Sequence, residues 1–96
     1  MFFNNLAIAY RDAGHYEKAI EECEKTLQRE PNTQFPYTHM AISFIRLGRE
    51  EQARADAAEI LRVNPKFSLE SYAKMLPFTK PVADRVIEDL RKAGLK

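Results

Sequence analysis

Few side chains of this 96-residue chain have the type and spacing that catalysis or metal binding requires. Cys23 and two histidines, His15 and His39, match no zinc-ligand spacing. No base stands where it would activate Cys23, so a buried, small apolar residue is the simpler interpretation of this thiol. The three glycines form no phosphate-binding loop. We therefore expect no enzymatic activity, no metal and no cofactor.

Composition and charge limit the classes of binding partner that we expect. The net charge is +1, from 15 basic and 14 acidic residues, and no basic stripe of the kind that nucleic acid attracts is present. No apolar run approaches the roughly 20 residues of a membrane helix. The first ten residues lack the basic start of a signal peptide, and one cysteine fits a reducing compartment. We expect a cytoplasmic protein that binds neither nucleic acid nor membranes.

A 34-residue period determines how these side chains are positioned. Shifting the sequence by one period places residues of the same class on one another. The matching pairs are Phe3 with Tyr37, Leu6 with Met40, Ala7 with Ala41, Ile8 with Ile42, Tyr10 with Phe44, Gly14 with Gly48, Ala19 with Ala53, Leu27 with Leu61 and Pro31 with Pro65. Each unit therefore has the same internal construction.

The pattern predicts two helices in each unit, with a glycine between them and a proline after the second. We predict helices over 3–13, 16–29, 35–47 and 50–63, because glycine accepts the left-handed conformation of a helix stop and proline prevents continuation. His15 is then a solvated turn residue, and His39 a surface or groove residue. Ala7 and Ala19 are small enough to let two helices approach closely.

The last third departs from the period. Residues 68–76 read as another first helix, with Tyr72 and Met75 on its inner side, and a final helix begins near Pro81, where proline is favoured. Gly94 ends that helix, and Leu95 completes a Schellman-type stop. The expected fold is all-α: two full repeats over 1–33 and 34–67, then a partial third repeat and capping helix over 68–96, in one domain.

The aromatic, alanine, glycine and proline positions of the period resemble the tetratricopeptide repeat. The resemblance covers the first two-thirds of the chain, with Phe3 and Tyr37 where the family favours tryptophan. It implies a right-handed α-solenoid whose first helices line a concave groove for a protein or peptide ligand. The positions that match the groove are Asn4, Ile8, Arg11, Asp12, Phe35, Thr38, Ile42, Ile45, Arg46 and Tyr72. Among them we expect exposed apolar side chains for contact and arginines for hydrogen bonds.

Two alternatives stay open beside groove binding. Phe2, Leu6 and Ala9 form a second apolar stripe on the first helix, which predicts an upstream repeat or a homodimer through that helix. The end of the chain, from Leu76-Pro77-Phe78 to Leu90-Arg91-Lys92-Ala93-Gly94-Leu95, resembles the end of repeat regions in bacterial adenylate/guanylate cyclase-type proteins. That resemblance implies the regulatory tail of a longer bacterial signalling protein.

Overall fold

The computed structural model describes residues 5–75 and 80–96, with side chains from residue 9 onward. Six helices follow one another along the chain: α1 (Asn5–Asp12), α2 (Tyr16–Arg29), α3 (Gln34–Arg46), α4 (Glu50–Val63), α5 (Leu69–Met75) and α6 (Lys80–Lys92). Over these ranges no residue lies in a β-strand. The prediction of an all-α, repeat-type fold is confirmed.

Three helices end in the same way, at the glycines that the sequence marked. At the end of α6, Gly94 has φ +105° and the Leu95 N–H donates to the Leu90 carbonyl over 3.2 Å, which is the longer bond of a Schellman motif. Gly14 and Gly48 also have positive φ, and the residue after each donates in the same pattern. The predicted helix stops are therefore confirmed, and His15 is exposed in its turn.

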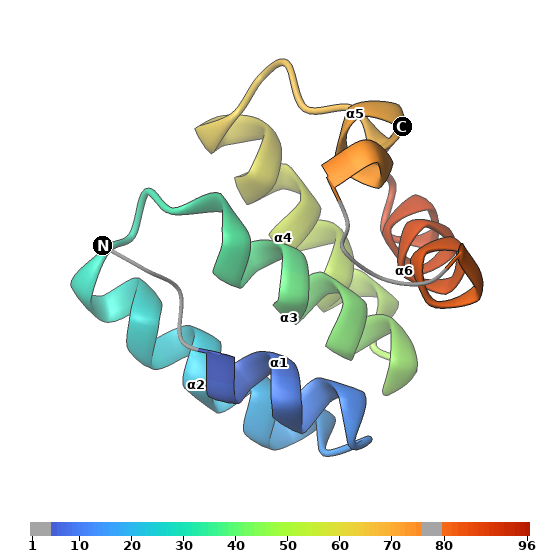
Figure 1. The fold of residues 1–96 in the computed structure, drawn as a ribbon. Coiled ribbons are helices and arrows are strands. Elements are labelled where there is room, and N and C mark those ends of the chain that lie inside the picture. Colours follow the sequence, from blue (N-terminus) through green and yellow to red (C-terminus); the bar gives the residue numbers. More distant parts are fainter. Residues whose placement is uncertain (1–4, 76–79) are drawn as a thin grey trace.

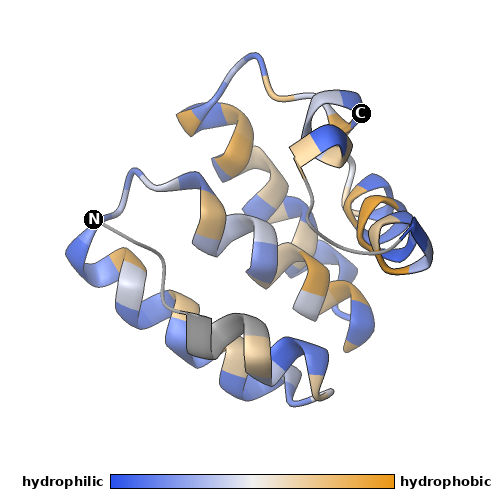
Figure 2. Ribbon diagram, in the orientation of Figure 1, coloured by the Kyte–Doolittle hydropathy of each residue, from blue (hydrophilic) through white to orange (hydrophobic). Residues whose placement is uncertain are grey.

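The first four helices form two hairpins that lie side by side, with α3 packed against both α2 and α4 (Figure 1). Their contact surfaces are built from small residues: Ala19, Ala41 and Ala53 are completely buried. In Figure 2, apolar residues are frequent along α3 and α4, whereas polar residues predominate along α2. Small side chains at these crossings allow the helices to approach closely.

The C-terminal helices α5 and α6 do not pack on the second hairpin in the way that the second hairpin packs on the first. α6 packs against α3, α5 packs against α6, and the Leu69 N–H donates to the Lys96 carbonyl over 2.9 Å. The molecule is consequently almost as wide as it is long, with extents of 29 × 28 × 27 Å. Tyr72 is buried as expected, but the prediction that Met75 faces inward is wrong, because its side chain is 67% exposed.

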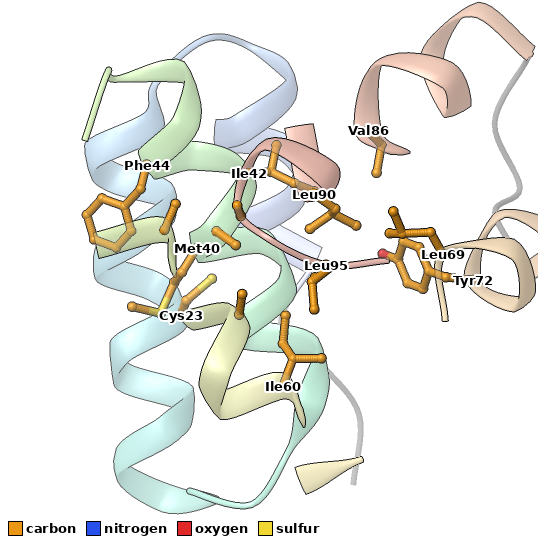
Figure 3. Packing of buried hydrophobic residues seen from close by; sticks show 14 of the residues in the cluster. Cys23, Met40, Ile42, Phe44, Ile60, Leu69, Tyr72, Val86, Leu90 and Leu95 are labelled. Carbon is orange, nitrogen blue, oxygen red and sulfur yellow. The ribbon is translucent and has the colours of Figure 1, made fainter. Parts of the chain in front are cut away.

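One hydrophobic cluster joins the repeat helices to the C-terminal pair. In Figure 3, Leu90 and Leu95 lie between the repeat helices and Tyr72 of α5. Both leucines are almost completely buried. Cys23 belongs to the same cluster as a free thiol, and burial raises its pKa to about 12, with a smaller contribution from the charge of Asp56. Its interpretation as a small core residue is confirmed.

Candidate functional site

The side of α3 that should line a groove is divided by α6. Ile42, near the middle of this side, is only 3% exposed, because α6 lies against it. The prediction that Ile42 offers an open apolar surface is therefore wrong in this structure. Thr38 is fully buried, and its hydroxyl donates to the Gln34 carbonyl over 3.3 Å. Among the described residues, one cleft lies at each end of α3.

The first, here called the apolar cleft, lies between the start of α3, the α4–α5 loop and α5. Its wall includes Phe35, Phe67, Tyr72 and Met75. The rings of Phe67 and Tyr72 meet with centroids 5.6 Å apart, and burial raises the pKa of Tyr72. Phe35 is 45% exposed and Met75 67% exposed, so the cleft opens an apolar surface to solvent. Lys66 lies at the same cleft.

The second, here called the polar cleft, lies at the ends of α1 and α3, under α6. Its volume is about 130 Å³. Residues from four helices line it: Arg11, Asp12, Tyr16, Ile42, Arg46, Val82, Arg85, Val86 and Asp89. Most of these side chains can donate or accept hydrogen bonds, so this cleft suits a charged group.

Arg46 and Asp89, which both line the polar cleft, are paired with each other. The Arg46 Nε–H donates to Asp89 Oδ2 over 2.8 Å, joining α3 to α6. Asp89 is buried, and burial raises the pKa of its carboxyl, while the charge of Arg46 and its hydrogen bond oppose that rise. The pair therefore helps to hold α6 on α3.

Arg11 and His39 connect the first helices of the two repeats. The guanidinium of Arg11 contacts Nδ1 of His39 and also pairs with Asp12 over 3.3 Å. Arginine cannot accept a hydrogen bond, so Nδ1 is the acceptor and the ring is neutral. Burial, and then the charge of Arg11, lowers the pKa of His39 to about 3. The expectation of a surface or groove histidine is wrong, since the ring is buried between α1 and α3.

The structure thus separates the residues that were expected to form one groove. Arg11, Asp12 and Arg46 meet at the polar cleft, whereas Phe35 and Tyr72 meet at the apolar cleft. Ile45 is half-buried beside the core. Asn4 lies outside the described residues, as does the side chain of Ile8.

The residues of α6 that line the polar cleft were not among the site residues predicted from the sequence. Val82, Arg85 and Asp89 line the polar cleft, yet none of them belongs to the 34-residue period. Asp89 lies 43 residues from Arg46 along the chain, and no local pattern links the two positions. The only available signal was the amphipathic pattern of the last helix, which indicates burial but not a neighbour.

The remaining expectations concern self-association through the first helix, metal binding and membrane crossing. Phe2 lies outside the described residues, as does the side chain of Leu6, while Ala9 is exposed. The homodimer through the first helix therefore stays a prediction. Among residues 9–75 and 80–96, no three His, Cys, Asp or Glu side chains are grouped to hold a metal ion. None of the described helices has the length and apolar character needed to cross a membrane.

Comparison with known proteins gives two matches. Residues 1–33 match the family model of the tetratricopeptide repeat. Over 44 residues the chain is 41% identical to the phagocyte signaling-impaired protein of Aedes aegypti; the aligned part covers 46% of this chain and 5% of that protein. The resemblance of the C-terminal part to cyclase-type proteins stays a prediction. What the family comparison shows is therefore one tetratricopeptide repeat, at residues 1–33.

Proposed function

We propose that this chain is a protein-binding module that holds a segment of another protein on the side formed by α1, α3 and α5. Repeats of this family generally mediate contacts between proteins. The observation that carries the proposal for this chain is the apolar cleft. Among the described residues, three large apolar side chains stand out as exposed, and two of them, Phe35 and Met75, line that cleft.

Exposed apolar side chains that share one cleft favour a binding role over a purely structural one. A single exposed apolar residue is ordinary, but neighbouring ones at a concave site are typical of contact surfaces. Aromatic residues and methionine are also enriched at protein interfaces. The third exposed side chain, Leu61 of α4, is 42% exposed and lies outside the cleft, so it provides a matched control.

The proposal assigns binding and no chemistry. Cys23 is buried with a raised pKa, so its reactive thiolate form is disfavoured. His39 is held neutral by Arg11 inside the protein, where a substrate does not reach it. The Cys23 thiol and the His39 ring are therefore both committed to the interior.

Selection of binding peptides tests the proposal. Peptides would be selected from a displayed random library on the chain, and their affinities measured for the wild type, Phe35→Ser and Leu61→Ser. We expect Phe35→Ser to weaken binding at least about tenfold, because a buried apolar contact of this size contributes about 1.5–3 kcal/mol. Leu61→Ser should leave the affinity unchanged. Selected peptides that respond equally to both variants, or to neither, would place the binding surface elsewhere.

A further inference from the structure

The polar cleft carries more positive than negative charge. Three arginines, Arg11, Arg46 and Arg85, line it together with two aspartates, Asp12 and Asp89. With all five ionised, one positive charge is left without a counter-charge inside the cleft. Arg11 is already engaged by His39 and Asp12. The uncompensated charge therefore belongs to the pair formed by Arg46 and Arg85.

Arg46 is held in place by Asp89 but still has hydrogen-bond donors available. Its Nε–H donates to Asp89, which fixes the plane of the guanidinium, while its Nη atoms make no hydrogen bond to any described residue. An arginine has five N–H donors in a rigid fork, so two parallel N–H groups can still reach the two oxygens of one acid group. Its side chain is 38% exposed, so those donors are accessible.

Arg85 supplies a second cation to the lining of the cleft, from α6. It is exposed on α6, and within the described part of the chain it has neither an ion pair nor a hydrogen bond. Two other basic residues of this helix are already paired, Lys80 with Asp84 over 3.4 Å and Arg91 with Glu88 over 3.3 Å, and neither lines the cleft. Arg85 is thus the basic residue of α6 that lines the cleft with its charge available to a ligand. Lys92 of the same helix lowers the pKa of Asp89 through its charge but does not line the cleft.

We propose that the polar cleft binds one carboxylate of the protein segment that the module holds, with Arg46 and Arg85 as its donors. The size fits, because a cavity of roughly 150 Å³ accepts a benzene-sized molecule, and this cleft of about 130 Å³ accepts an aspartate or glutamate side chain or a chain terminus. The charge also fits, since a carboxylate carries the one negative charge that balances the cleft, whereas a phosphate monoester carries close to two.

This inference rests on the proposed function only in taking the carboxylate from a bound protein segment. Phe35 and Arg46 lie eleven residues apart on α3, which places the two clefts about 16 Å apart along the helix. Sites at such a distance respond independently to substitution. A titration can therefore show no carboxylate binding at the polar cleft while selected peptides still bind at the apolar cleft. The opposite result is equally possible, so the two proposals are tested separately.

The test is a titration of the full chain with N-acetylglutamate. The NMR signals of the arginine Nε–H groups report the binding. We expect saturable shifts for Arg46 and Arg85 in the millimolar range, and none with N-acetylglutamine at matched ionic strength. Arg85→Gln should weaken the binding roughly fivefold to tenfold, in line with one charged hydrogen-bonding group. Arg91→Gln, on the same helix but outside the cleft, should leave it unchanged.

Three outcomes would overturn the proposal. The first is the absence of saturable shifts at Arg46 and Arg85. The second is an equal response to N-acetylglutamine, which would show that the negative charge is not recognised. The third is inorganic phosphate binding more tightly than N-acetylglutamate, which would assign the cleft to phosphoryl groups instead.

Discussion

Arg46 of α3 and Asp89 of α6 are joined over 2.8 Å, although 43 residues separate them in the sequence. Asp89 is only 3% exposed, so its carboxylate depends on the guanidinium for its charge. The pair closes the C-terminal helix onto the second repeat and at the same time orients Arg46 in the polar cleft. One contact thus serves both stability and the proposed binding of a carboxylate.

We predict that Arg46→Ala destabilises the protein by about 1–3 kcal/mol, because it leaves a buried carboxylate without its charged donor. Urea unfolding provides the measurement. Arg54→Ala is the matched control, since its ion pair with Glu50 is exposed on both sides and should contribute less than about 1 kcal/mol. Equal effects of the two variants would mean that the Arg46–Asp89 contact is no more than a surface pair.

The overpacking prediction concerns Ala19, which is completely buried in α2. Ala19→Leu should cost roughly 1–3 kcal/mol, because the extra volume forces neighbouring helices apart. Thermal or urea unfolding would show the loss. Ala55→Leu, at an exposed position of α4, adds the same side chain without a packing conflict and serves as the control. Neutral behaviour of Ala19→Leu would contradict the close approach of the helices. Ala7, its expected partner, lies outside the described side chains.

The glycine that ends α3 allows a backbone prediction. Gly48 has φ +76°, and a Cβ atom added there would meet nothing within 4 Å. Gly48→Ala therefore tests backbone conformation without a steric clash, and it should destabilise the chain by about 1–2 kcal/mol. Gly48→Asn should cost less, since asparagine accepts the left-handed region more readily. If alanine and asparagine were equally harmful, conformational preference would not explain the position.

Two buried groups should give stability opposite dependences on pH. His39 has a pKa of about 3 in the folded chain, well below its ordinary 6.5, so the unfolded chain binds the extra proton and stability is lost as pH falls from 6.5 toward 3. Burial, helped by the charges of Glu24 and Glu59, raises the pKa of Asp56 from 3.8 to about 7. The folded chain then holds the extra proton, so stability is lost as pH rises from 3.8 toward 7.

We expect these two slopes to offset each other in the wild type and to separate in single variants. Asp56→Asn removes the loss at high pH, and its advantage over the wild type should grow from pH 4 to pH 8 to on the order of 2 kcal/mol. Asp56 Oδ2 is buried and has no hydrogen-bond partner among the described residues, so little is lost with the carboxylate. Urea unfolding at several pH values measures the difference. The exposed Glu51→Gln controls for net charge, and an Asp56→Asn advantage that is constant with pH would contradict the prediction.

The local features of this fold followed from the sequence alone. Glycine at Gly14, Gly48 and Gly94 and proline at Pro31 and Pro65 place the helix ends through backbone sterics, which act within a few residues. The 34-residue period predicted two similar hairpins, and Ala19 was predicted at a close approach of two helices. The apolar character of Cys23 also followed, because its place in the period is a packed one.

Only the tertiary structure decided where the last helix lies and what it covers. Amphipathic spacing on α6 requires an apolar partner, but many surfaces satisfy that requirement, and nothing near Asp89 indicates Arg46 as its neighbour. The packing of α6 against α3 buries Ile42 and brings Arg85 to the polar cleft, while Phe35 at the other end of α3 stays exposed. Repeat sequence patterns are local and specify the hairpins. The division of their inner side into two clefts depends on contacts between residues far apart in the chain, which only the packed molecule selects.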